Sequence, residues 1–109
     1  MIACVRAIRV RRYVDMIVAP LEVWFDGGIR SGQDVLKALA LGAHATLIGR
    51  AYVYGLGALG EAGVTTALEL IRRELELTMV LCGVRDVSGI GRSALQFAKG
   101  RAMGLGDST

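Results

Sequence analysis

Two short apolar runs, each followed by glycine, are the first pattern along the chain. The run Leu21–Phe25 carries β-branched and aromatic residues and leads into Asp26-Gly27-Gly28. The run Ala45–Ile48 leads into Gly49. Brief apolar runs bounded by turn residues are typical of buried strands. We therefore expect two strands, each ended by a glycine turn.

The segment between these runs predicts a helix. Ser31 is a favourable N-cap, and Asp34 follows three residues later as the acidic partner of a capping box. Gly42 is a suitable C-cap, and the apolar stripe between the caps consists of Val35, Leu36, Leu39 and Ala40. Because roughly twenty residues separate the strand ends, one right-handed crossover fits between them and the strands should be parallel.

A longer helical pattern covers residues 64–81. Its apolar side chains recur with the helical period at Val64, Leu68, Ile71, Leu75 and Met79. Glu69 and Arg73 are spaced to form an ion pair on the solvated side, and Gly83 should end the helix. A weaker pattern predicts a short helix at Ser93–Lys99, and the glycine-rich segment 100–109 is expected to be a flexible tail.

Composition narrows the class of protein. The chain has 109 residues, of which 53% are apolar and 21% charged, so it has material for a core and is not disordered throughout. Cys4 and Cys82 lie far apart with no metal-ligand spacing around them, which favours a reducing cytoplasm and predicts neither a disulfide framework nor a metal site. No apolar stretch is long enough for a membrane span.

The net charge of +3 belongs to the first twenty residues. They hold four arginines and one aspartate, whereas the other 89 residues hold nine basic and nine acidic side chains. The body of the chain therefore lacks a polyanion-binding pattern, and no nucleic-acid partner is expected. Arginines also interrupt the apolar stretch that a secretory signal would need.

The two glycine turns are the best candidates for chemistry. The carboxyl ends of adjacent parallel strands lie at one edge of a sheet, where α/β proteins bind ligands. Gly27 and Gly28 would let backbone N–H groups approach an anion, and Arg50 could add a two-pronged contact. Asp26 would orient the loop, while the following helix N-termini would add positive charge. From spacing alone, an anion site and a pair of ordinary turns are equally good interpretations.

Other residues carry less information. His44, the single histidine, is expected to be a solvent-facing loop residue and not a general base. Cys82 is expected to be a small buried side chain, and Tyr52 and Tyr54 to be core or rim aromatics. No catalytic triad, pair of acids or metal cluster can be assembled, so the sequence predicts no catalytic residue.

Residues 21–86 contain an ordered series of motifs: Asp26-Gly-Gly-Ile-Arg30-Ser-Gly-Gln-Asp34, Ile48-Gly-Arg50, Tyr54-Gly-Leu, Gly60-Glu-Ala-Gly-Val64 and Glu76-Leu-Thr-Met79. This series strongly resembles the C-terminal part of the FMN-dependent 2-hydroxy-acid dehydrogenase and oxidase family, which includes L-lactate and mandelate dehydrogenases and glycolate oxidase. Shorter versions of the first loop occur in other phosphate-binding barrels, such as inosine-monophosphate dehydrogenase. The last two motifs favour the flavin family.

The resemblance implies an α/β fold, the portion of a (β/α)8 barrel around strands seven and eight with their helices. It also implies an FMN phosphate lined by Asp26, Gly27, Gly28, Ile29 and Arg30 in one loop and by Gly49 and Arg50 in the next. Members of the family oxidise an L-2-hydroxy acid to a 2-oxo acid. A histidine takes the hydroxyl proton, arginines hold the carboxylate, and the flavin accepts the hydride.

Departures from the family pattern limit what this chain should do alone. The His-Gly-Gly-Arg motif, which carries the base and a carboxylate-binding arginine, does not occur in it. Residues 1–20 do not carry the family's motifs, and we expect them to be mistranslated from a shifted frame or misplaced start, or disordered. With residues 21–99 as the barrel portion, we expect no turnover from this chain.

Three interpretations stay open at this point. The chain is a portion of a flavoenzyme, a small phosphate-ligand or partner-binding module, or a piece of a different phosphate-binding barrel. A two-stranded unit would leave sheet edges and apolar faces uncovered, so we also expect homo-oligomers or aggregation through those edges.

Overall fold

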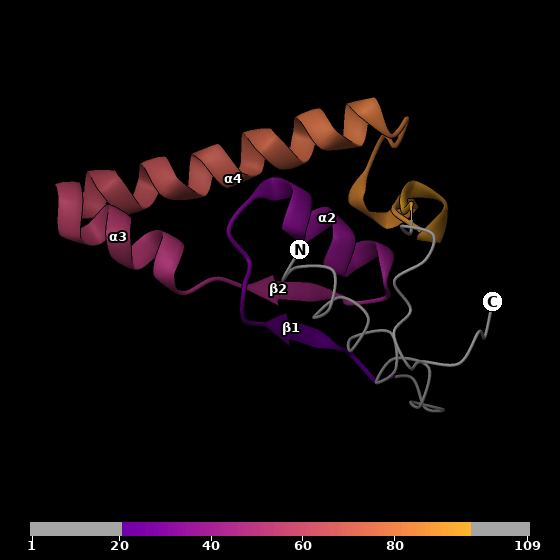
Figure 1. Ribbon diagram of the computed structural model, residues 1–109, viewed down its shortest axis with the longest axis horizontal. Coiled ribbons are helices and arrows are strands. Elements are labelled where there is room, and N and C mark those ends of the chain that lie inside the picture. The colour runs from indigo at the N-terminus through magenta and orange to yellow at the C-terminus, as the bar shows by residue number, and fades with distance from the viewer. Residues whose placement is uncertain (1–20, 97–109) are drawn as a thin grey trace.

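The computed structural model describes residues 21–96, which form a small α/β unit (Figure 1). Its elements, in chain order, are β1 (Trp24–Asp26), α2 (Gly32–Ala40), β2 (Ala45–Leu47), α3 (Arg50–Leu59), α4 (Glu61–Leu81) and two single 3₁₀ turns at Val87–Gly89 and Arg92–Ala94. The expectations for 1–20 and 100–109, and for the end of the predicted helix at Lys99, lie outside the described residues.

The two strands and the helix between them form the predicted parallel crossover unit. β1 pairs with β2 in parallel, with Trp24 opposite Ala45 and Asp26 opposite Leu47. α2 lies between this sheet and α4, so the three form successive layers (Figure 1). The core sits between sheet and α2: Ile29, Ala38 and Ala43 are buried there, and Phe25, Val35 and Ile48 pack against them.

The start of α2 follows the predicted capping pattern with one change. Ser31 has extended backbone angles, and its Oγ accepts a hydrogen bond from the Asp34 N–H at 3.3 Å. The Asp34 carboxylate accepts from the Arg30 N–H at 3.1 Å, one residue before the amide that a capping box would use. Leu41 caps the carboxyl end, and Gly42 follows it with a φ of 107°.

Helix α3 was not among the predicted elements. It contains Gly55 and Gly57, which disfavour helices in isolation. The close approach of α4 explains it: a Cβ on Gly55 would lie 2.8 Å from the carbonyl carbon of Gly63 in α4. The two helices thus form a hairpin whose backbones touch, and this tertiary contact overrides local propensity.

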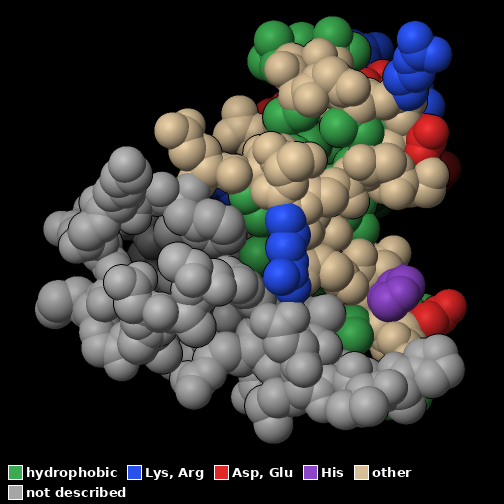
Figure 2. Space-filling view, turned by 90° about the vertical axis from the view of Figure 1, so that its right-hand side faces the viewer, with side chains coloured by type: hydrophobic (Ala, Val, Ile, Leu, Met, Phe, Trp, Pro, Cys, Tyr) green, Lys and Arg blue, Asp and Glu red, His purple; other side chains and the backbone are tan. Residues whose placement is uncertain are grey.

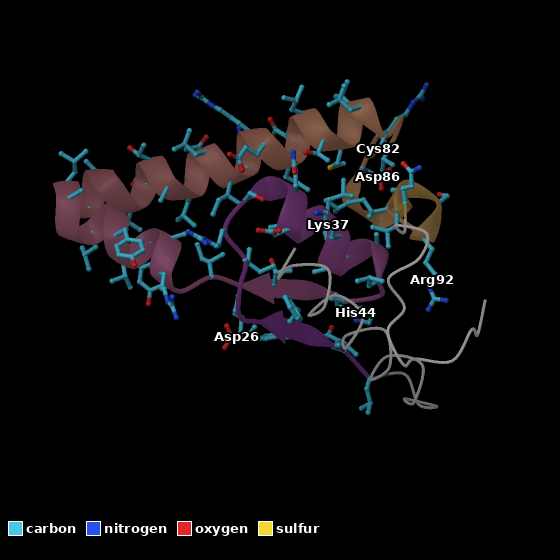
Figure 3. All side chains as sticks on the ribbon, in the orientation of Figure 1. Asp26, Lys37, His44, Cys82, Asp86 and Arg92 are labelled. Carbon is cyan, nitrogen blue, oxygen red and sulfur yellow. The ribbon has the colours of Figure 1, made fainter. Side chains whose placement is uncertain are left out.

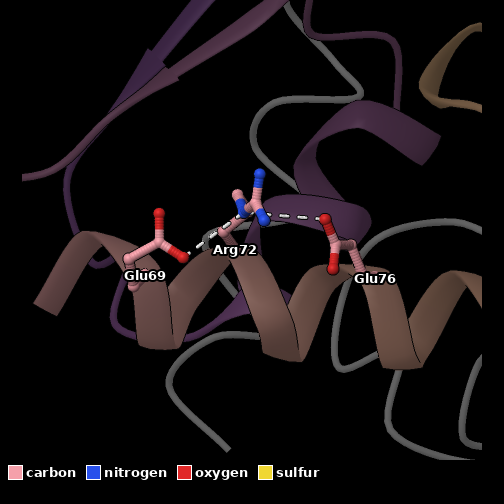
Figure 4. Close-up of polar contacts among 3 residues, drawn as sticks. All are labelled: Glu69, Arg72 and Glu76. Atoms are coloured by element: carbon pink, nitrogen blue, oxygen red, sulfur yellow. Dashed lines mark ion pairs between the residues drawn. The ribbon is translucent and has the colours of Figure 1, made fainter. Parts of the chain in front are cut away.

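Helix α4 confirms the longest predicted helix and begins three residues earlier. Met79 is buried, and Val64, Ile71 and Leu75 are half-buried, whereas Leu68 is 50% exposed. Glu69 forms an ion pair with Arg72, at 3.5 Å, and not with Arg73 as predicted. Arg72 also pairs with Glu76 at 3.6 Å (Figure 4). All three side chains are largely exposed, so these ion pairs add little stability.

The burial expectation for Cys82 is wrong, because this side chain is exposed. Of the two alternatives for Tyr52 and Tyr54, a core position is excluded, since Tyr52 is 39% and Tyr54 70% exposed. The reason is that the outer sides of α3 and of the last turn of α4 have no covering element within residues 21–96. Apolar side chains consequently reach the surface of the described unit (Figure 2). None of the helices described is both long enough and apolar enough to cross a membrane.

Candidate functional site

The two predicted ligand loops leave the sheet at the same edge. Asp26 ends β1 directly opposite Leu47, which ends β2, so residues 27–31 and Ile48-Gly49 both begin at the carboxyl-terminal edge. Figure 3 places Asp26 at this edge and His44 at the other end of the sheet. The pairing of parallel strands therefore brings together the two segments that the sequence analysis singled out.

The glycines of these loops have the backbone geometry that an anion cradle needs. Gly27 has a φ of 106° and Gly28 a φ of 78°, a region that side-chain-bearing L residues rarely adopt. A Cβ placed on Gly27 or Gly49 would meet no atom within 4 Å. Open space thus lies in front of the backbone in both loops, and a ligand could approach the amides closely.

The two helices that begin at this edge differ in their N-termini. At α2, the Gly32 N–H donates to the Glu74 Oε2 at 2.8 Å, and Ser31 and Asp34 bind two more amides. Two carboxylates therefore already neutralise the positive end of α2, and the expectation that this end attracts an anion is weakened. The hydrogen bond to the Gly32 N–H comes from Glu74, which lies 42 positions away along the chain.

Among residues 21–96, the N-terminus of α3 has no such side-chain partner. Gly49 is its N-cap and makes no side-chain capping bond, and the first turn has no acidic residue. Arg50 is the first residue of the helix and is exposed. Unsatisfied amides at a helix start together with an arginine favour anion binding. Sequence reasoning singled out Gly49 and Arg50 but missed the helix that they begin.

The remaining residues of the first loop differ in exposure: Asp26 and Arg30 are exposed, whereas Ile29 is buried. Arg30 is exposed, but its backbone N–H is bound by Asp34, so its guanidinium is the group left for a ligand. The side chain of Ile29 is only 5% exposed and belongs to the core, so it anchors the loop. Asp26 is exposed at the end of β1. Contact of these residues with a ligand stays a prediction.

His44 has a structural role at the opposite edge. Its Nδ1 accepts a hydrogen bond from the Val23 N–H at 3.0 Å, and its own backbone N–H donates to the Val23 carbonyl at 2.7 Å. The side chain is exposed, as expected for a loop residue. These bonds extend the strand pairing just before β1, away from the candidate ligand loops (Figure 3).

A perturbed carboxyl group lies outside the site. The Ser88 hydroxyl and the Gly89 N–H both donate to Asp86, and these bonds lower the pKa of this carboxyl below its ordinary value. Asp86 is the N-cap of the 3₁₀ turn Val87–Gly89. Its lowered pKa is accounted for by local capping. In residues 21–96, no three His, Cys, Asp or Glu side chains gather as a metal site would require.

The sequence of this chain matches a known protein family over most of its length. The family model described as FMN-dependent dehydrogenase matches residues 2–97. The chain belongs to this family. The resemblance inferred from the motifs is confirmed, and a different phosphate-binding barrel is no longer needed to explain the chain. The match includes residues 2–20, which the motifs had set apart; the boundary at residue 20 stays a prediction.

The chain matches only part of each curated relative. It is 54% identical over 81 residues to L-lactate dehydrogenase of Caulobacter vibrioides, covering 74% of this chain and 21% of the relative. It is 43% identical over 89 residues to mouse 2-hydroxyacid oxidase 2, covering 82% of this chain and 25% of the relative. The chain therefore spans about a fifth to a quarter of the length of these relatives.

Solved structures agree with the sequence matches. An active mutant of (S)-mandelate dehydrogenase superposes with a TM-score of 0.76 at 38% identity, over 83% of this chain and 25% of that protein. A mandelate oxidase mutant carrying a monooxide FMN adduct gives a TM-score of 0.73 at 43% identity, over 79% of this chain and 27% of that one. The described unit thus has the fold of part of an FMN-dependent barrel enzyme.

Proposed function

We propose that this chain supplies the phosphate-binding part of an FMN site in an oxidoreductase that oxidises an L-2-hydroxy acid, lactate-like in size, to a 2-oxo acid. In barrel terms it corresponds to strands seven and eight with their helices. One observation carries the proposal: parallel pairing brings the open Gly27-Gly28 loop and the uncapped start of α3 to one edge of the sheet.

The residues at this edge fit a phosphate dianion. The amides of Gly27 and Gly28 and the guanidinium of Arg30 would hold it from the first loop. The amide of Gly49 and the side chain of Arg50 would hold it from the second, aided by the start of α3. Asp26 would orient the first loop and Ile29 would anchor it in the core. The bound FMN would supply the acceptor for the substrate hydride.

The substrate class is supported by the names of the relatives. They include L-lactate dehydrogenase, 2-hydroxyacid oxidase and mandelate dehydrogenase, all named for small 2-hydroxy acids. The 109 residues contain no His-Gly-Gly-Arg motif. We infer that this chain alone binds the phosphate end and has no turnover. Lactate-dependent reduction of a dye by the purified chain would contradict this inference.

Binding is tested by titrating the isotope-labelled chain with FMN, with inorganic phosphate and with riboflavin, which lacks the phosphate. We expect FMN and phosphate to shift the amide resonances of Gly27, Gly28 and Gly49, and riboflavin to leave them unchanged. Arg30→Gln and Arg50→Gln should each weaken FMN binding about tenfold, the equivalent of one charged hydrogen bond.

The matched control is Arg73→Gln, which removes an exposed arginine from α4 without changing either loop. It should bind FMN like the unmodified chain. Equal binding of riboflavin and FMN, or unchanged binding in both loop variants, would exclude the proposed phosphate site.

A cytoplasmic location is also proposed. The two cysteines stand far apart in sequence without a pairing or metal-binding motif, as is usual in a reducing compartment. One solved relative, (S)-mandelate dehydrogenase from Pseudomonas putida, is described as membrane-associated. Fractionation of cells that express the chain distinguishes the two locations: recovery in the membrane pellet would contradict ours.

A further inference from the structure

Helix α2 begins in direct contact with the backbone of α4. A Cβ on Gly32 would lie 2.6 Å from the Ile71 carbonyl oxygen and would also collide with the backbone of Glu74 and Leu75. Real Cβ atoms essentially never approach other atoms this closely. The absence of a side chain at position 32 therefore sets the distance between the start of α2 and the middle of α4.

Glu74 joins the two helices at this contact. Its Oε2 accepts a hydrogen bond from the Gly32 N–H at 2.8 Å, in a partly buried setting. The amide belongs to the first residue of α2, where no partner is available within the helix. A carboxylate at a helix N-terminus is favourable, and a hydrogen bond to a charged group is stronger than a neutral one.

Among the described residues, Ile29 and the start of α2 hold the first ligand loop in place after β1. A Cβ on Gly27 would meet no atom within 4 Å, whereas Ile29 is anchored in the core. At the start of α2, the Arg30 N–H donates to the Asp34 carboxylate, and the Ser31 Oγ accepts from the Asp34 N–H. The Gly32 N–H donates to Glu74. The direction of the loop amides therefore depends on where α4 holds Gly32.

From this contact we infer that Glu74 is a positioning residue for the phosphate loop, acting through Gly32. The inference rests on the function proposed above. Glu74 has two effects: it fixes the loop at its carboxyl end, and it occupies the positive end of α2. An incoming phosphate is therefore directed to the Gly27-Gly28 amides and to the start of α3.

Three variants of the full chain test this inference with inorganic phosphate and FMN as probes. Glu74→Ala removes the acceptor, whereas Glu74→Gln keeps a neutral carbonyl acceptor of the same length. Glu76→Ala is the matched control, because it removes a carboxylate two residues away that pairs with Arg72 and not with α2. Dissociation constants are read from the amide shifts of the folded species.

We expect Glu74→Ala to weaken binding of both probes about tenfold, as the loss of one charged hydrogen bond would. It should also displace the amide resonances of Gly27, Gly28 and Arg30 while leaving those of β2 in place. Glu74→Gln should restore most of the affinity, and Glu76→Ala should not change it. If Glu74→Ala fails to fold, Glu74→Met keeps the packing of the stem without an acceptor and takes its place.

The outcomes separate the two proposals. If the unmodified chain binds both probes and the acceptor-free variant binds them equally well, the role of Glu74 is wrong and the proposed function stands. If Gln does not restore binding, the hydrogen-bond mechanism is wrong. If the unmodified chain binds neither probe, the proposed function fails, and the role of Glu74 in it fails as well.

Discussion

Ser31 is the N-cap residue of α2. Its Oγ binds the Asp34 amide at 3.3 Å, and its carbonyl accepts from Val35 at 3.3 Å. Replacing an N-cap serine by alanine removes the side-chain acceptor, so we expect Ser31→Ala to lower the free energy of unfolding by about 1 kcal/mol. Urea unfolding followed by circular dichroism measures it.

The control for this change is Ser93→Ala in the 3₁₀ turn Arg92–Ala94, where an exposed serine is not the N-cap. It should alter the free energy of unfolding by less than the N-cap variant. Equal effects of the two substitutions would show that the Ser31 cap does not stabilise α2.

The lowered pKa of Asp86 predicts that the stability of the 3₁₀ turn Val87–Gly89 depends on pH. Its pKa is lowered by the Ser88 hydroxyl and the Gly89 N–H, so the charged form is favoured in the folded chain. A lowered pKa contributes stability above the ordinary value of 3.8 that is lost as the pH falls through the folded value. We expect amide exchange at Gly89, corrected for intrinsic rates, to accelerate below about pH 4. Asp86→Asn should abolish this dependence; if it persists, another group is responsible.

At the scale of elements, the hairpin of α3 and α4 depends on two facing glycines. A Cβ on Gly63 would lie 2.6 Å from the Gly55 carbonyl carbon, so Gly63→Ala must push the helices apart. We expect a loss of about 1–3 kcal/mol in the free energy of unfolding, although alanine is the better helix former. Thermal and urea unfolding measure it.

Gly57 in α3 is the matched control for this prediction. A Cβ there meets no atom within 4 Å, so Gly57→Ala should stabilise the chain by ~0.5–1 kcal/mol. Opposite signs for the two glycine substitutions would confirm that helix contact, and not propensity, decides the hairpin. Two changes of the same sign would contradict it.

Local sequence patterns predict most of the helices and strands, but not all of them. β1, α2, β2 and α4 follow from apolar runs, the Ser31 cap and helical periodicity, because each signal acts within a few residues. Helix α3 was not predicted, because Gly55 and Gly57 disfavour a helix locally and Gly55 is required only by its close contact with Gly63. In the proposed site, the sequence predicts roles for Gly49 and Arg50, which stay predictions, but it does not predict that these residues begin a helix.

At the scale of the whole molecule, the described unit leaves much apolar surface uncovered. Leu77 is 61% exposed and Leu81 78% exposed on α4, and Trp24 is 61% exposed in β1 of the sheet. Within residues 21–96 the sheet has only two strands, so each has an unpaired edge. Such surfaces favour association with another copy of the chain.

We therefore expect the purified chain to self-associate with rising concentration. Leu77→Lys combined with Leu81→Lys should shift sedimentation toward the monomer, because two charges would be buried without partners on association. The control is Thr65→Lys on an exposed position of α4, which should not shift it. A stable, monodisperse unmodified monomer would instead favour the small-module interpretation.

The sequence by itself determined the parallel crossover unit, the two glycine loops and membership of the flavin family, because these depend on local caps, periodicity and ordered motifs. Tertiary structure decided which helix start already has a carboxylate partner. Glu74 reaches Gly32 across 42 residues, whereas among residues 21–96 the start of α3 has no carboxylate in its first turn and no side-chain cap, and no local pattern encodes that difference. It also decided that α3 is a helix, since the packing of its backbone at Gly55 against Gly63 of α4 offsets the low helix propensity of its glycines.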